Sequence, residues 1–441
     1  MRRLGAWLAG LGLAAMLSGP AAALSLIRDA EIEATLGRMT APVLRAAGYT
    51  PEAVSLYLVN NRSLNAFVAG GNNMFLHTGL ITELDTPEQL IGVIAHETGH
   101  LAGGHQARRS MALRNAEGPA LIAMVAGLLA GAAAGSPEAA VGLSAGSQGA
   151  LQRAFLRYNR GEEAAADQAA LRYLEQVGVD PRGLLEVLET FRGQEVFQAG
   201  NRDPYVLTHP LSSERMALLE RKVEEADVPR EPDPEREYWF ARMQAKLEGF
   251  LDPPRRVLSR REGEAETEPV LYARAIAYHR LPAPGDALAA LDRLLEIRPD
   301  DPYYLELKGQ VLFESGRAAE AVPLYRRAMR AAPDQPLIKT GLGRALLALD
   351  TPDANAEALA VLKEARAANR SDPAALRALA TAHARAGEEG MAALATAERF
   401  ALTGNVRDAQ LHARRAEARL AQGSPGWLRA QDILALDAGE E

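Results

Sequence analysis

The hydrophobic and polar positions of residues 24–80 change their period once. In "LIRDAEIEATLGRMTAPVLRAAG", the apolar residues Ile27, Ile32, Leu36 and Met39 recur at roughly helical spacing. The next segment, "VSLYLV", alternates apolar and polar residues, "NAFVAGG" ends in a glycine turn, and "NMFLHTG" follows. Runs of this kind are typical of short strands. The pattern predicts a helix followed by a small antiparallel sheet.

A further helix is predicted to begin at Thr86-Pro87. Thr86 can cap this helix, Pro87 suits the first helical position, and Gln89 stands where the partner of a capping box belongs. The helix contains "AHETGHLAGGH", so three of the chain's eight histidines lie within ten positions. These histidines are therefore expected on a helix and not in a loop.

Residues 119–135, "PALIAMVAGLLAGAAAG", form an apolar run without a charge. The run is shorter than the ~20 residues that a transmembrane helix requires. Two interpretations remain open. One is a buried helix or helical hairpin of the same domain, and the other is an apolar flap or membrane-facing segment that gives peripheral membrane contact.

The second half of the chain repeats itself. Pro302 aligns with Pro336 and Gly309 with Gly343, which gives a period of 34 residues, and "SDPAALRALATAHARAGEEG" repeats the opening. Paired helices with this period and closing prolines are typical of tetratricopeptide repeats. Each helical pair buries its apolar face against the next pair, so the repeats are expected to form an α-superhelix with a groove for peptides or partner proteins.

Composition and charge exclude some classes of function and partner. The formal net charge of −8 argues against nucleic acid as a partner, because no excess of basic residues is available to neutralise phosphates. The first 23 residues have two arginines, an apolar run and small residues before Ala23, which predicts a secretory signal peptide cleaved after Ala23. The chain has no cysteine, which excludes a disulfide framework.

The histidine-rich helix contains an HExxH motif, "HETGH", from His96 to His100. Residues i and i+4 project from one helical face, so both histidines can bind the same Zn²⁺, with Glu97 beside the open position as general base. The third-ligand position of the metzincin arrangement falls on Gln106, which is not a histidine. We therefore interpret His105 as a neighbour of the ligands or a helix-end residue.

A catalytic zinc site needs a third protein ligand and leaves its fourth position to water. The candidate is Glu163 in "YNRGEEAAADQAALRYL", four residues before Asp167 and so on the same helical face. Asp167 can accept the second N–H of a ligating histidine and fix its tautomer. Glu162 is adjacent but points about 100° away. The pattern predicts one zinc ion per chain, bound by His96, His100 and Glu163.

These motifs resemble the zinc endopeptidase family that includes the CAAX prenyl protease and the heat-shock protease HtpX. The resemblance rests on the motifs "HETGH", "YNRGEEAAAD", "NAFVAGGNNMFLHTGL" and "THPLSSERM", which fall within residues 60–216. It implies a gluzincin-type α+β metallopeptidase domain in a mostly α protein. It also implies that the edge strand near Asn65, Ala66 and Phe67 pairs with an extended substrate.

The same resemblance places His209 and Arg215 near the developing oxyanion, as catalytic residues. For His209 a second role stays open, that of an inhibitory fourth zinc ligand, and for Arg215 a surface salt bridge is the alternative. We predict a signal peptide at 1–23, the zinc metallopeptidase domain at 24–225, a helical boundary region at 226–268 and the repeat domain at 269–441.

Exported family members with C-terminal tetratricopeptide repeats extend the resemblance to nearly the whole chain. They imply a periplasmic endopeptidase that acts in the quality control and assembly of outer-membrane proteins. The expected partners are misfolded or stalled outer-membrane proteins as substrates, and the β-barrel assembly machinery bound through the repeat groove. The alternative is a chaperone or scaffold that works through its repeats and has a mostly latent protease site.

Overall fold

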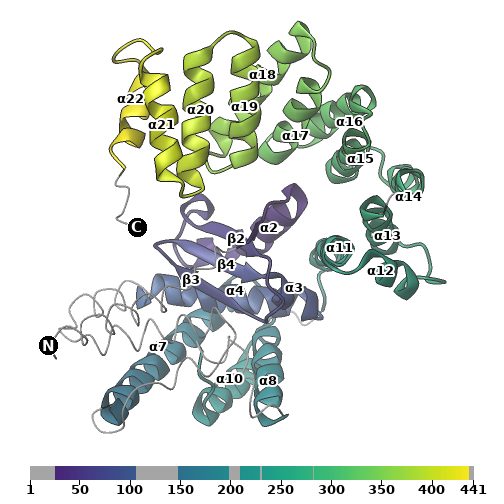
Figure 1. Cartoon of the computed structure of the whole chain (residues 1–441). Coiled ribbons are helices and arrows are strands. Elements are labelled where there is room, and N and C mark those ends of the chain that lie inside the picture. Colours follow the sequence, from purple (N-terminus) through teal and green to yellow (C-terminus); the bar gives the residue numbers. More distant parts are fainter. Residues whose placement is uncertain (1–24, 106–147, 198–208, 229–230, 282, 437–441) are drawn as a thin grey trace, which may run out of the picture. The chain divides into compact units, whose positions relative to one another are not determined.

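The computed structural model describes residues 25–105, 148–197, 209–228, 231–281 and 283–436 (Figure 1). The predicted signal peptide, the apolar run at 119–135 and most of the loop before His209 lie outside the described residues. Contacts divide the chain into unit 1, residues 1–27 and 37–231, and unit 2, residues 28–36 and 232–441. The domain bounds given by the sequence stay a prediction. In the described part of the chain, no helix has the length and apolar character needed to cross a membrane.

Unit 1 contains a four-stranded sheet in the order β1-β2-β4-β3. Its strands are β1 (Leu26–Ile27), β2 (Ser55–Val59), β3 (Ala66–Ala69) and β4 (Asn73–His77). The β1–β2 and β3–β4 pairs are antiparallel, but the central β2–β4 pair is parallel. The predicted antiparallel sheet is therefore wrong for its central pair. The β3–β4 hairpin places β3 outside β4, so that β4 and not β3 lies beside β2.

The predicted glycine turn between β3 and β4 is confirmed. Gly70 and Gly71 have φ values of 58° and 91°, in the left-handed region that glycine adopts without steric cost. The turn leaves β3 as one edge of the sheet. Phe67 on β3 stacks on Phe75 of β4 with 4.9 Å between ring centroids. An edge strand presents backbone groups that can pair with another chain.

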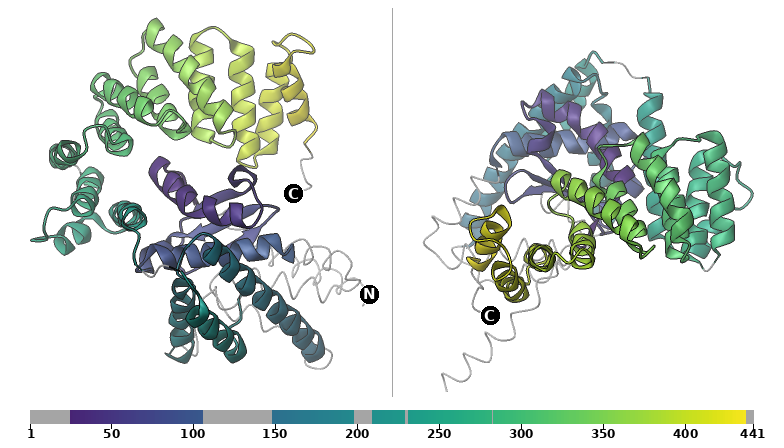
Figure 2. Two further views of the ribbon diagram at one scale, coloured as in Figure 1. Left: turned by 180° about the vertical axis from the view of Figure 1, so that it is seen from behind. Right: turned by 90° about the horizontal axis from the view of Figure 1, so that it is seen from above.

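Helix α4 (Pro87–Ala102) is the most buried helix of unit 1, and all its residues from Leu90 to Leu101 are buried. It begins with the predicted capping box, in which Thr86 and Gln89 exchange hydrogen bonds. It contacts β3 as well as helices α7 and α8 (Figures 1 and 2). The other elements are a 3₁₀ turn (Pro51–Ala53), α3 (Thr78–Glu83), α7 (Gln148–Gln176), α8 (Arg182–Phe197), α10 (Ser213–Glu225) and the second part of α2 (Ala30–Ala46).

Unit 2 is built from paired helices, and the repeat prediction is confirmed. Pro302, Pro336 and Pro373 start α15, α17 and α19, which pack on α16, α18 and α20 respectively. An added Cβ at Gly309 would lie 2.9 Å from the Tyr325 ring, so the small residue lets the paired helices approach. These are tetratricopeptide-like repeats.

The helices of unit 2 continue from residue 234 to residue 434. They are α11 (Pro234–Leu251), α12 (Pro254–Arg260), α13 (Glu268–Arg280), α14 (Pro284–Ile297), α15 (Pro302–Glu314), α16 (Ala318–Ala331), α17 (Pro336–Leu347), α18 (Pro352–Ala368), α19 (Pro373–Arg385), α20 (Glu389–Leu402), α21 (Val406–Glu417) and α22 (Pro425–Leu434).

The start of α2 belongs to unit 2 and carries a buried carboxylate, Glu31. Glu31 accepts hydrogen bonds from Arg242 Nε at 2.6 Å and from the Tyr272 hydroxyl at 2.5 Å. Its second oxygen lies 3.4 Å from Lys246 Nζ. Burial alone would lower the pKa of Arg242 and of Lys246, but the neighbouring carboxylates outweigh burial and raise both values. The two buried cations are therefore held in their charged forms.

Candidate metal centre

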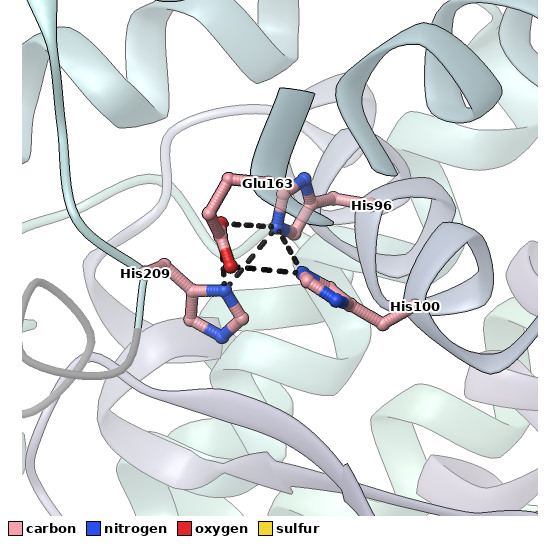
Figure 3. Close-up of side chains that lie close together, drawn as sticks. All are labelled: His96, His100, Glu163 and His209. Carbon is pink, nitrogen blue, oxygen red and sulfur yellow. Dashed lines mark hydrogen bonds and ion pairs between the residues drawn. The ribbon is translucent and has the colours of Figure 1, made fainter. Parts of the chain in front are cut away.

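The three predicted zinc ligands, His96, His100 and Glu163, converge with His209 in unit 1 (Figure 3). Helix α4 carries His96 and His100 on one face, α7 carries Glu163, and His209 precedes α10. One ligand atom from each residue lies within 4.8 Å of the others, and all four side chains are buried. Residues as far apart as 96 and 209 therefore meet at one point.

The atoms that face each other are potential metal ligands. The two Nε2 atoms of His96 and His100 lie 3.0 Å apart, and each is 3.3 Å from an oxygen of Glu163. His209 Nδ1 lies 3.3 Å from His96 Nε2 and 3.1 Å from Glu163 Oε2. Figure 3 shows these contacts as dashed lines between the four side chains.

These separations fit a zinc ion. Nitrogen and oxygen ligands about 2.0–2.1 Å from a tetrahedral zinc lie about 3.3 Å from one another, close to the 3.0–3.3 Å found here. Within the described residues, Glu163 Oε1 is buried and accepts no hydrogen bond. A buried carboxylate oxygen without a donor is costly unless a cation compensates it. The donor set of imidazoles and one carboxylate is that of a zinc site.

Asp167 and Arg215 contact the proposed ligands His96 and Glu163. Asp167 Oδ1 lies 2.9 Å from His96 Nδ1, at the position expected for an acceptor of that ring's second N–H. The Arg215 guanidinium donates to both Asp167 oxygens and lies 3.1 Å from Glu163 Oε2. Arg215 is 5% exposed, so the surface salt bridge considered for it is wrong. The arginine compensates two buried carboxylates at once.

Three further polar residues considered in the sequence analysis, Glu97, His105 and Glu162, lie close to the four side chains in sequence. Glu97 Oε1 is buried 3.4 Å from His209 Nε2. His105 Nδ1 lies 2.8 Å from His100 Nδ1, on the side of that ring away from Glu163, as expected for a neighbour of the proposed ligand His100. Glu162 is buried but is not part of the group of ligand atoms.

Burial and charge act in opposite directions on the two motif histidines. Burial lowers the pKa of His100 to about 3, although Glu163 acts the other way. Burial alone would also lower the pKa of His96, but Asp167 and Glu163 outweigh it and raise the value to about 9. For Glu163 burial is outweighed by His209 and His100, which lower its pKa well below the usual range. Glu163 is therefore a carboxylate.

Two glycines of α4 also matter for the site, and the sequence analysis missed them. An added Cβ at Gly99 would lie 2.7 Å from the carbonyl oxygen of Ala166 on α7, and one at Gly92 would lie 2.8 Å from Leu184 N on α8. Both contacts are with backbone, which cannot move aside cheaply. Their spacing of seven on the motif helix was the available signal, because such residues share one face. Gly99 lets α7 bring Glu163 next to the histidines.

The substrate-pairing residues predicted from the sequence lie at the start and along the edge of the sheet. Asn65 precedes β3, and Ala66 and Phe67 are its first residues. Asn65 and Ala66 are buried, and Phe67 is partly exposed. The strand lies beside α4, the helix that carries the two histidines.

The chain is similar to several known proteins. Residues 27–223 match Peptidase family M48. The chain is 25% identical over 373 residues to a beta-barrel assembly-enhancing protease of Yersinia pestis, which covers 83% of this chain and 75% of that protein. A protein of the same name from Escherichia coli (strain K12) is 25% identical over 369 residues, covering 80% and 72%. A solved thermophilic TPR protein of Thermus thermophilus is 19% identical over 37% of this chain and 96% of its own, with a TM-score of 0.27.

Proposed function

We propose that this chain, an M48 zinc peptidase followed by tetratricopeptide-like repeats, is a periplasmic endopeptidase that acts on outer-membrane proteins during their quality control and assembly. The observation that carries the proposal is the buried convergence of His96, His100 and Glu163 beside Glu97. The name shared by two relatives supports the client class. The predicted signal peptide, with cleavage after Ala23, supports export.

The proposed chemistry is hydrolysis of a peptide bond. His96, His100 and Glu163 would hold one zinc ion per chain, which when bound lowers the pKa of a water molecule and polarises the scissile carbonyl. Glu97 takes the proton of the attacking water and delivers it to the leaving amine. Asp167 keeps His96 in the tautomer whose Nε2 lone pair points into the cluster, because its carboxylate accepts a hydrogen bond from Nδ1–H.

Arg215 is proposed as a positioning residue. The sequence resemblance implies a place near the oxyanion, but its guanidinium donates to Asp167 and to the Pro210 carbonyl. Those bonds tie the segment that carries His209 to the acid that orients His96. Loss of Arg215 would thus leave Asp167 and Glu163 as buried carboxylates with less compensating charge.

Substrate is proposed to add to the sheet at β3. This strand is a sheet edge and contacts α4, so an extended peptide paired along Asn65, Ala66 and Phe67 would run beside the motif histidines. Backbone hydrogen bonds would supply affinity without regard to sequence. An endopeptidase that acts on misfolded clients needs such tolerance.

The repeats are proposed to hold the client or the β-barrel assembly machinery. A hollow of about 800 Å³ between α19, α20 and α21 supports this role. Its lining residues include small side chains, mostly alanines and threonines, together with Arg385, Arg415 and Arg419. Tethering a client there would raise the local concentration of its unfolded segments at the peptidase site.

Metal content and proteolysis test the proposal together. Purified chain should contain one zinc ion, which His96→Ala and Glu163→Ala remove, whereas Glu162→Ala, the matched change one residue away, keeps it. Glu97→Gln should retain zinc but lose cleavage of an unfolded outer-membrane protein. Retention of zinc by Glu163→Ala would contradict the ligand assignment.

Complementation of a deletion strain distinguishes an active peptidase from a scaffold with a latent protease site. His209 Nδ1 lies within 3.3 Å of two proposed ligands, which favours a site that is closed at rest. If Glu97→Gln restores outer-membrane protein assembly in a deletion strain as well as the unchanged chain does, the repeats alone carry the function. Loss of complementation supports proteolysis.

A further inference from the structure

Unit 2 contains a second hollow, here called the α18–α22 pocket, of about 510 Å³ between α18, α19, α20 and α22. Small-molecule sites commonly have volumes of about 300–1,000 Å³. Its residues separate into two kinds. Leu379, Met391 and Leu394 give an apolar part, while the charged part consists of Lys363, Arg366, Arg370, Arg429 and Glu398.

The charged part is strongly basic. Glu398 is shared by two arginines, since its Oε2 accepts from Arg366 Nη2 and its Oε1 from Arg429 Nη1, each at 2.9 Å. Lys363 and Arg370 form no hydrogen bond or ion pair with any described residue. Three positive charges thus remain uncompensated around the pocket, in a chain whose net charge is −8. Such a concentration of charge needs a reason.

Helix stability explains only part of it. Arg366 lies in the last turn of α18, where a cation interacts favourably with the helix dipole, whereas Lys363 lies one turn earlier. Arg370 directly follows the C-cap Asn369, but Arg429 comes from α22, so the end of α18 does not explain the charges of Lys363 and Arg429. His383 lies buried in the wall, and burial lowers its pKa, which leaves it neutral near pH 7.

We propose that the α18–α22 pocket binds a small amphipathic anion. A phosphate or carboxylate group would lie against Lys363 and Arg370, whose charges are uncompensated, and an apolar chain would lie on Leu379 and Met391. The pairing of both surfaces within one hollow selects against purely polar anions and against neutral lipids. The site is separate from the peptidase centre, because all its residues belong to unit 2.

Calorimetric titration of the full chain tests this proposal with octyl phosphate, octanoate and octanol. Octyl phosphate or octanoate should bind, octanol should not, and the tighter of the two anions identifies the head group. Lys363→Gln with Arg370→Gln should weaken binding at least tenfold. The matched double variant Arg377→Gln with Arg407→Gln removes the same charge from exposed positions outside the pocket and should leave binding unchanged.

A second variant tests whether binding needs the volume of the pocket as well as its charge. Ala367→Trp fills the pocket at an exposed position of α18 without altering its charge, and it should also abolish binding. Raising NaCl to about 0.5 M should weaken binding, because exposed charges are screened. Equal binding to the Lys363/Arg370 and Arg377/Arg407 double variants, or no binding of either octyl anion, would overturn the proposal. Inorganic phosphate binding as tightly as octyl phosphate would refute the apolar half.

Discussion

Replacing Glu31 by glutamine should destabilise unit 2 far more than the loss of a surface charge would. Glu31 has no exposed surface and accepts hydrogen bonds from Arg242 and Tyr272, with Lys246 Nζ 3.4 Å away. Glutamine keeps the size of the side chain and removes its charge. Arg242 and Lys246 then stay buried with less negative charge around them.

The expected loss of unfolding free energy depends on which carboxylates remain beside Arg242 and Lys246 in the variant. Removing one partner of a buried ion pair costs about 3–5 kcal/mol. Asp301 still accepts from Arg242 Nη1 at 2.6 Å, and Asp29 remains 2.8 Å from Lys246 Nζ, so neither cation is left alone. We therefore expect a loss of about 3 kcal/mol. For a unit of about 220 residues this corresponds to a fall in Tm of roughly 6–12 °C.

Urea unfolding followed by tryptophan fluorescence measures this loss. Trp239 is a local probe, because Arg242 Cζ lies 5.0 Å from the centre of its ring, and a Trp427→Phe background removes the other tryptophan of unit 2. Glu33→Gln is the matched control, since it makes the same change on the same helix at a partly exposed ion pair worth less than about 1 kcal/mol. If both variants lose the same free energy, the buried cluster does not stabilise unit 2 as reasoned.

Three further predictions concern unit 1. His209→Ala should raise proteolysis at unchanged zinc content if the imidazole closes the site, whereas a ~100-fold fall would identify an oxyanion donor and an unchanged rate would contradict both roles. Gly99→Ala should weaken zinc binding in a chelator competition by forcing α7 away from α4, and Gly161→Ala, whose Cβ would meet open space, should not. Burial lowers the pKa of His77 to about 4, so the unfolded chain takes up a proton between pH 6.5 and 4 that the folded chain refuses. The free energy of unfolding should therefore decrease as the pH is lowered through this window, by up to about 2 kcal/mol at pH 5. Calorimetry should find that His77→Gln removes this part of the decrease.

Local spacing explains why much of the metal centre could be predicted from the sequence. A helix turns every 3.6 residues, so His96 and His100 meet on one face wherever the helix lies. Glu163 required a longer inference across 63 residues. It was accessible because Glu163 and Asp167 share a face in an alanine-rich stretch that can pack closely against another helix. The 34-residue period identified the repeats for the same reason, since each unit repeats one local structure.

Features that depend on which element becomes the neighbour could not be predicted. Alternating residues look alike in parallel and antiparallel strands, so "VSLYLV" carries no signal for the parallel pairing of β2 with β4. From the sequence, Gly99 is only a weak helix former, because its close contact with Ala166 of α7 is known only from the structure. The contact between His209 and Glu163 spans 46 residues and joins a loop to a helix, so no periodicity relates them.

The helix α2 shows the same limit at the level of domains. Its apolar spacing is continuous, yet its residues up to Leu36 belong to unit 2 and the rest to unit 1. A cut near residue 225 would therefore leave Asp29 and Glu31 on one fragment and Arg242 with Lys246 on the other. Each fragment would lose the partners of its ion pairs, and Arg242 and Lys246, if they stay buried without Glu31, would be costly charges. The roles of peptidase and repeats are thus better separated in the full chain by substitution, with Glu97→Gln for the chemistry and arginine replacements for the repeats, than by truncation.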